Sequence, residues 1–139
     1  MARILAIDYG KKRTGIAVSD PLQIIANSLA TVGTHEIFDF LTSYFKKEHV
    51  STIVVGYPKQ MNNLPSEAVN YINPFIRKLK KIWPEKELVL MDERFTSKMA
   101  VQTMIEGGLK KSKRRDKALI DAISATIILQ SYMDSIKTK

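Results

Sequence analysis

The sequence predicts an α/β fold in which a mixed sheet is flanked by helices, and two observations support this class. Short apolar runs bounded by Gly, Pro or Asp alternate with longer segments of helical periodicity. The first two strands are close enough in sequence to pair as an antiparallel hairpin, whereas the later strands are separated by helices and favour parallel crossover units. We therefore expect one domain over residues 1–139, with a hairpin edge joined to parallel strands.

Five segments have the composition of strands. The first covers 3–8, "RILAID", and is followed by the turn signal Tyr9-Gly10. The chain then turns through "KKRTG", and a second strand over 16–20 stops at Pro21. The other three are a weaker strand over 28–32, the β-branched run 51–57 and the apolar run 87–91.

Helical spacing of apolar residues predicts helices over 34–49, 66–83, 97–106 and 117–136. Thr34 and Ser66 are expected to cap the first two, and Gly107-Gly108 is expected to end the third. The basic segment 109–117, "LKKSKRRDK", has the composition of an exposed loop. The expected sheet is therefore mixed, five-stranded and flanked by helices.

The composition narrows the classes of function. The chain has 22 Lys and Arg against 14 Asp and Glu, and this net charge of +8 favours a polyanionic partner, either nucleic acid or an acidic membrane surface. The absence of cysteine excludes disulfides, cysteine-based zinc sites and a thiol nucleophile. No apolar run approaches the ~20 residues of a membrane span. The opening "MARILAIDYG" also has too short an apolar run for a signal peptide. We therefore expect a cytoplasmic protein.

Acidic residues fall where predicted strands end. Asp8 follows the first apolar run, and Asp92 and Glu93 follow the run 88–91, so these acids are expected at the carboxyl edge of the sheet, where ligands bind in α/β folds. Asp92 and Glu93 point to opposite faces if their strand continues, so one of them is expected to enter a site. Asp121 shares a helix face with Ala125 and Ile128, and a buried carboxylate there needs a cation, a partner or water.

Three converging carboxylates form an oxygen-rich site suited to Mg²⁺ or Mn²⁺. Two such ions about 4 Å apart can activate water and stabilise the leaving oxygen of a phosphodiester. Each acid also has an ordinary structural interpretation, because acids at strand ends commonly form caps and turns. Asp20, before Pro21, is interpreted as a turn residue, and Asp116 is a competitor of Asp121 that lies among loop charges.

Two groups of cations accompany the acids. Lys11, Lys12 and Arg13 adjoin Asp8 in a turn and could contact phosphates, although turn cations are usually only solvated. A denser cluster precedes Asp121 and has the character of a phosphate-backbone contact surface. Its members are Lys110, Lys111, Lys113, Arg114 and Arg115. The cations at positions 77–81 are interpreted as the outer face of an amphipathic helix, and the tyrosines show no interleaving with cations that would form a base-stacking platform.

Four stretches in order resemble the YqgF family, which is related to the RuvC-type Holliday-junction resolvases of the ribonuclease-H-like superfamily. They are "AIDYGKKRTGIAVSD", "IVVGYPKQMNN", "MDERFTSKMA" and "DAISATIILQSY". The resemblance implies an RNase-H-like fold and a divalent-metal nuclease acting on structured nucleic acid. Family members are assigned either to junction resolution or to maturation of the 5′ end of pre-16S ribosomal RNA.

Carried over residue by residue, the resemblance implies that Asp8, Glu93 and Asp121 are the catalytic, metal-binding acids. It also places Arg13 and Arg94 near the phosphates. Asn63 stands where the family usually has Gly, and Asn also tolerates the left-handed backbone conformation.

The leading hypothesis is an endonuclease with two Mg²⁺ or Mn²⁺ ions, water as nucleophile and a 3′-hydroxyl leaving group, acting on the 5′ end of pre-16S rRNA. A Holliday-junction resolvase in DNA recombination is the first alternative, and a non-catalytic RNA-binding factor in ribosome assembly is the second. A third class, an actin-like ATPase, also opens with a D-x-G after its first strand but needs two domains. The sequence leaves both a monomer and a homodimer open.

Overall fold

A computed structural model describes residues 2–57, 69–92 and 117–137, with the backbone alone for 92, 117–122 and 137. The described strands form one five-stranded sheet in the order β3-β2-β1-β4-β5. They are β1 (Arg3–Tyr9), β2 (Arg13–Ser19), β3 (Ala26–Gly33), β4 (Val50–Tyr57) and β5 (Glu87–Asp92). β1 pairs antiparallel with β2 and parallel with β4, β2 pairs antiparallel with β3, and β4 pairs parallel with β5. The expected mixed sheet is thus confirmed.

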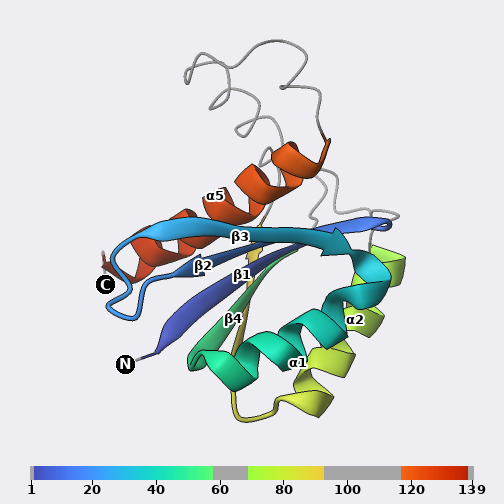
Figure 1. Ribbon diagram of the computed structural model, residues 1–139, viewed down its shortest axis with the longest axis horizontal. Coiled ribbons are helices and arrows are strands. Elements are labelled where there is room, and N and C mark those ends of the chain that lie inside the picture. Colours follow the sequence, from blue (N-terminus) through green and yellow to red (C-terminus); the bar gives the residue numbers. More distant parts are fainter. Residues whose placement is uncertain (1, 58–68, 93–116, 138–139) are drawn as a thin grey trace.

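Helices cover both faces of the sheet (Figure 1). The helices α1 (Ile37–Lys47) and α2 (Val69–Ile82) lie on one face, and α5 (Lys117–Lys137) lies across the other. Successive side chains of β1 point to opposite faces of the sheet and so contribute to both cores. Leu5 and Ile7 belong to the core under α1 and α2, whereas Ile4 and Ala6 belong to the core under α5. All four side chains are at most 1% exposed, so β1 is the buried centre of the sheet.

The turn between β1 and β2 is tighter than the sequence predicts. β2 begins at Arg13 rather than at residue 16, because Thr14 and Gly15 pair with Tyr9 and Asp8 across the hairpin. Only residues 10–12 remain outside the two strands. The hairpin therefore extends to the end of β1 and places Asp8 inside a paired stretch of sheet.

Thr34 does not cap the first helix, contrary to the prediction. Residues Thr34–Glu36 form a short 3₁₀ turn before α1, and no side chain caps either element. The Thr34 hydroxyl instead donates to the carbonyl of Gly10 at 2.7 Å, so the Thr14 hydroxyl, 2.9 Å away, must donate to Thr34. The Thr34 amide also donates to the carbonyl of Lys12 at 3.0 Å. Thr34 therefore fixes the β1–β2 turn.

The remaining helices agree with the predicted periodicity. In α2 the residues Ile72, Phe75, Ile76 and Leu79 are buried at helical spacing. The bounds of α5 match the predicted helix 117–136 to within one residue. The predicted helix 97–106, residues 66–68 and most of the basic loop lie outside the described residues.

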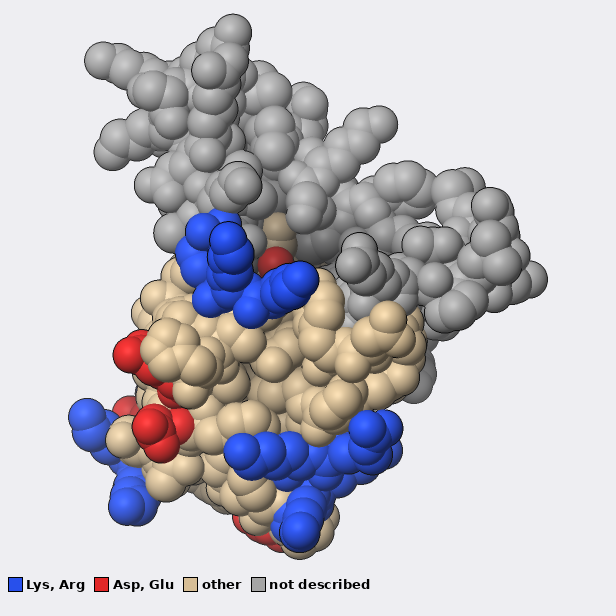
Figure 2. All heavy atoms as spheres, turned by 90° about the vertical axis from the view of Figure 1, so that its right-hand side faces the viewer, with Lys and Arg blue, Asp and Glu red and all other residues tan. Residues whose placement is uncertain are grey.

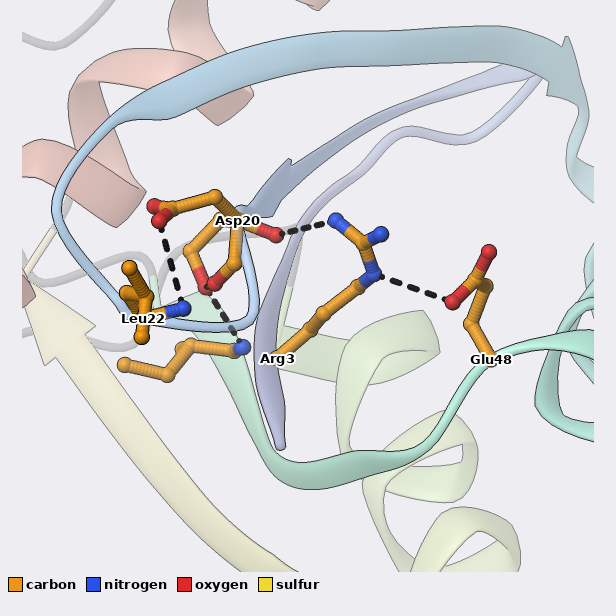
Figure 3. A network of polar contacts seen from close by, with 6 residues as sticks. Arg3, Asp20, Leu22 and Glu48 are labelled. Carbon is orange, nitrogen blue, oxygen red and sulfur yellow. Dashed lines mark hydrogen bonds and ion pairs between the residues drawn. The ribbon is translucent and has the colours of Figure 1, made fainter. Parts of the chain in front are cut away.

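Asp20 organises the turn between β2 and β3, as the sequence interpretation expects. Its carboxylate accepts hydrogen bonds from the amides of Leu22 at 3.2 Å, Ile24 at 2.7 Å and Ile25 at 2.8 Å. Figure 3 shows this turn beside the guanidinium of Arg3, which donates to Glu48 at 3.2 Å. These backbone donors, that of Ile25 most of all, lower the pKa of the Asp20 carboxyl group.

No helix in the described part of the chain is long and apolar enough to cross a membrane.

The Asp20 turn gives a prediction about stability and pH. Because the folded-state pKa of Asp20 is lowered, its carboxylate stabilises the fold above the unfolded pKa of about 3.9, and this contribution is lost as the pH falls through the folded pKa. Asp20→Asn should therefore lower the urea midpoint at pH 7. The difference from wild type should shrink towards pH 3. Glu85→Gln, the same loss of charge at an exposed turn residue, is the control. A pH-independent difference would contradict the carboxylate's role.

Candidate active site

The carboxyl ends of three neighbouring strands lie at one edge of the sheet (Figure 1). The parallel register aligns Ile7 with Val55 and Gly56 with Met91, so β1, β4 and β5 end at the same edge of the sheet. Asp8 is the last residue but one of β1 and is half-buried. This edge is the one at which the sequence predicts a site.

Asp8 and Asp121 occupy positions on the same side of the sheet. Asp8 follows Ala6 by two residues, so it shares the face on which Ala6 packs against α5. In α5 the residues Ala125 and Ile128 belong to the same core, and Asp121 lies on their stripe, one turn before Ala125. The amino-terminal end of α5 points to the edge where β1 ends (Figure 1). The fold therefore brings the positions of Asp8 and Asp121 to one side and one end of the sheet.

The third predicted acid lies outside the described residues. Glu93 directly follows Asp92, the last residue of β5, which stands in register with Tyr57 at the end of β4. Met91 packs against the core under α5. The described part of β5 thus leads to the same edge as β1 and ends one residue before Glu93.

A buried hydroxyl on α5 accompanies these acids. Ser124 follows Asp121 by three residues, is 1% exposed, and its Oγ has no hydrogen-bond partner among the described residues. A buried polar atom of this kind usually finds a water or another ligand. The described residues hold no group of three His, Cys, Asp or Glu that could bind a metal. The predicted set of three carboxylates, with Ser124 one helical turn after Asp121, is an all-oxygen donor set that fits a hydrated hard cation such as Mg²⁺ or Mn²⁺.

The β1–β2 turn carries cations beside Asp8. Lys11 and Lys12 are exposed and Arg13 is half-buried. Figure 2 looks onto this end of the molecule and shows Lys and Arg side chains gathered over the turn. The turn is closed so tightly that a Cβ on Gly10 would clash with the carbonyl oxygen of Arg13. Glycine at this position therefore fixes where the three cations lie relative to Asp8.

Aromatic side chains pack at the same end of the sheet but on its α2 face, opposite the face of Asp8, and the sequence interpretation missed them. The ring of Tyr9 stacks on Phe75 with centroids 4.0 Å apart and lies 6.0 Å from the ring of Tyr71. The Tyr57 hydroxyl donates to Asn73 Oδ1 at 2.8 Å. Burial raises the pKa of the Tyr9 hydroxyl, and the neighbouring Tyr71 raises it further. The only sequence signal was the position of Tyr9 and Tyr57 at strand ends, because their partners come from a distant helix.

The other predicted site residues and neighbours lie outside the described residues. They are Arg94, Lys110, Lys111, Lys113, Arg114 and Arg115, together with Asn63 and Asp116.

Solved structures define the class of fold. The chain is similar to Thermus thermophilus RuvC, with a TM-score of 0.57 at 16% identity over 98% of this chain and 97% of that one. RuvC from the same organism in complex with a Holliday junction substrate gives a TM-score of 0.56 at 15% identity, over 99% and 98% of the two chains. The mixed sheet with helices on both faces is therefore an RNase-H-like fold.

Sequence comparisons define the family within this class. Residues 2–135 match the family model described as "RuvX: Holliday junction resolvase". The chain is 61% identical over 135 residues to a Bacteroides fragilis protein named "Putative pre-16S rRNA nuclease", covering 97% of this chain and 98% of that protein. A Phocaeicola vulgatus protein of the same name is 60% identical over 137 residues and 99% of both chains. The chain belongs to the RuvX family, in agreement with the resemblance found in its motifs.

The closed turn beside Asp8 gives a test of the site's geometry. In Gly10→Ala the new Cβ meets backbone, so the turn must open, at a cost of about 2 kcal/mol in folding free energy. In Gly33→Ala the new Cβ meets only the movable ring of His35, at 2.9 Å, and the cost should stay within about 0.5 kcal/mol. Urea unfolding of both variants measures this, and equal losses would contradict the assigned role of Gly10.

Proposed function

We propose that this protein is a metal-dependent endonuclease that hydrolyses phosphodiester bonds in structured RNA and processes the 5′ end of pre-16S rRNA. The observation that carries the proposal is the meeting of β1 and α5, because it puts the positions of Asp8 and Asp121 on one side and one end of the sheet. Membership of the RuvX family and the names of relatives about 60% identical support a nuclease.

We assign metal binding to Asp8, Glu93 and Asp121. Glu93 is preferred to Asp92 because it is the acid that the family resemblance of the stretch "MDERFTSKMA" matches to a metal-binding position. When bound, Mg²⁺ or Mn²⁺ supplies an acidified water and positive charge at the phosphate. The oxygen ligands come from three separate segments, so the folded sheet must assemble the site.

The chain's own cations and the substrate complete the proposed reaction. Lys11, Lys12, Arg13 and Arg94 neutralise phosphate oxygens on either side of the cleaved bond, and they hold the strand against the edge. A water oxygen bonds to phosphorus while the P–O3′ bond breaks. The water gives up a proton and the departing O3′ takes one, so the products are a 5′-phosphate and a 3′-hydroxyl. We propose that the protein acts in the cytoplasm as a monomer or homodimer.

A second candidate function is resolution of Holliday junctions. It is favoured by the description of the family whose model matches residues 2–135. The same carboxylates and cations can cleave DNA or RNA, because phosphate contacts carry no information on sequence. The relatives named pre-16S rRNA nuclease are about 60% identical to this chain, whereas the RuvC structures are at most 16% identical, and this difference favours the RNA substrate.

Cleavage of two substrates side by side decides between these functions. An RNA that carries the 5′ precursor region of 16S rRNA and a four-way DNA junction would be incubated with the protein and Mg²⁺ or Mn²⁺, with EDTA as the metal-free control. We expect cleavage of the RNA, lost in EDTA. Cleavage of the junction alone would establish the resolvase, and RNA binding without cleavage in either metal would establish a non-catalytic assembly factor.

The acid assignment predicts unequal effects of the same substitution, Asp to Asn, at three positions. Asp8→Asn and Asp121→Asn should each lower the cleavage rate at least about 100-fold, because each removes a proposed metal ligand. Asp134→Asn makes the same change on the exposed side of α5, where Asp134 accepts a hydrogen bond from Gln130 at 2.9 Å, and should leave the rate unchanged. Full activity of Asp8→Asn or Asp121→Asn would refute the assignment.

A further inference from the structure

We propose that the outer face of α2 is a second nucleic-acid contact, which binds the sugar-phosphate backbone several nucleotides from the cleaved bond. We call its three residues, Arg77, Lys80 and Lys81, the α2 strip. The proposal rests on the nuclease function proposed above and extends its substrate contact beyond the β1–β2 turn. Its partner is the same nucleic acid, held through its phosphates.

The α2 strip points away from the core. At 100° per residue, Arg77 and Lys81 each lie about 160° around the helix from the buried Leu79. Lys80 lies on one flank, between the buried side and the outer side of the helix. All three residues are exposed. Lys78, on the other flank, is also exposed but is already engaged, because its Nζ lies 4.2 Å from the ring centroid of Phe38. The strip thus lies on the exposed side of the helix, where solvent and a large ligand can reach it.

The charge of the strip is not neutralised within the described structure. The α2 sequence contains no acid, and none of the three cations forms an ion pair with another described residue. Like charges three and four residues apart on a helix repel each other and cost stability. A polyanion that lies along the helix would remove this repulsion and release counterions.

Attraction to the helix dipole accounts for only part of this arrangement. Lys80 and Lys81 lie in the last turn of α2, where cations stabilise a helix. Lys46 and Lys47 have the same place in the last turn of α1 and are also exposed. Arg77 lies a turn earlier in α2, so the dipole does not explain it. The two lysine pairs therefore form a matched comparison.

The strip is within reach of a strand bound at the candidate site. Figure 2 shows, on the face that looks along the ends of the strands, one group of Lys and Arg over the β1–β2 turn and a second over α2. Asn73 of α2 contacts Tyr57, the last residue of β4. Lys81 lies eight residues further along the helix, or about 12 Å at 1.5 Å per residue. A nucleic-acid strand with a rise of about 3.4 Å per nucleotide covers that distance in about four nucleotides.

The experiment compares salt dependence of binding in matched variants. Wild type, Lys80→Gln/Lys81→Gln and Lys46→Gln/Lys47→Gln would be titrated with the labelled 5′ precursor RNA in EDTA, at several salt concentrations. Without metal no cleavage occurs, so binding is measured separately from the proposed chemistry. We expect the slope of log K against log salt to fall by about 2 in the α2 variant, about one per lost phosphate contact, and to stay unchanged in the α1 variant. Arg77→Gln should lower it by about 1.

Each outcome bears on the proposal. A selective fall in slope for the α2 variant supports it, provided that both double variants keep the helical circular dichroism of wild type. Equal falls in the two variants would show a general effect of net charge, and no fall would show that the strip lies outside the contact; either result overturns the proposal. If wild type fails to bind the RNA, both this proposal and the proposed RNA function are overturned. If the strip contributes to binding but the metal-containing assay shows no cleavage, only the proposed active site is contradicted.

Discussion

Strand β1 pairs with β2 on one side and with β4 on the other, and its central residues supply both cores of the protein. Ile4 and Ala6 pack under α5, whereas Leu5 and Ile7 pack under α1 and α2. A strand that is covered on both faces and paired on both edges has a fixed register, because a shift of one residue would turn each side chain to the opposite core. Asp8 continues this strand, so its place at the edge, on the α5 side, follows from the packing of four apolar side chains.

The same edge is shaped by contacts from distant segments. Thr34, directly after β3, donates to the carbonyl of Gly10 and holds the basic turn, while α2 supplies Phe75 and Tyr71 against Tyr9. The edge therefore carries cations in the β1–β2 turn and aromatic side chains on the α2 face of the sheet. The cations of the turn suit an anionic polymer, which agrees with membership of the RuvX family.

Much of this arrangement could be predicted from local sequence signals. The apolar runs that end at Asp8 and Asp92 predicted strand ends, and the spacing of Asp121 from Ala125 and Ile128 predicted a shared helix face. The role of Thr34 could not be predicted, because its hydroxyl can either cap the following helix or bond to a carbonyl 24 residues away in the sequence, and local sequence does not decide between them. The prediction of where β2 begins failed for a similar reason. Thr14 and Gly15 have the composition of a turn, but pairing with β1 places them in the strand. Tyr9 and Tyr71 meet only through the packing of α2 on the sheet.

We propose that acids of separate segments form one cation site at the edge of the sheet. Titration of the protein with Mn²⁺, followed by the electron paramagnetic resonance signal of the free ion, measures this site without any substrate. Wild type should bind Mn²⁺ saturably, and this binding should be greatly weakened in both Asp8→Asn and Asp121→Asn and retained in Asp134→Asn. Binding that survives in either of the first two variants as strongly as in wild type would contradict a shared site.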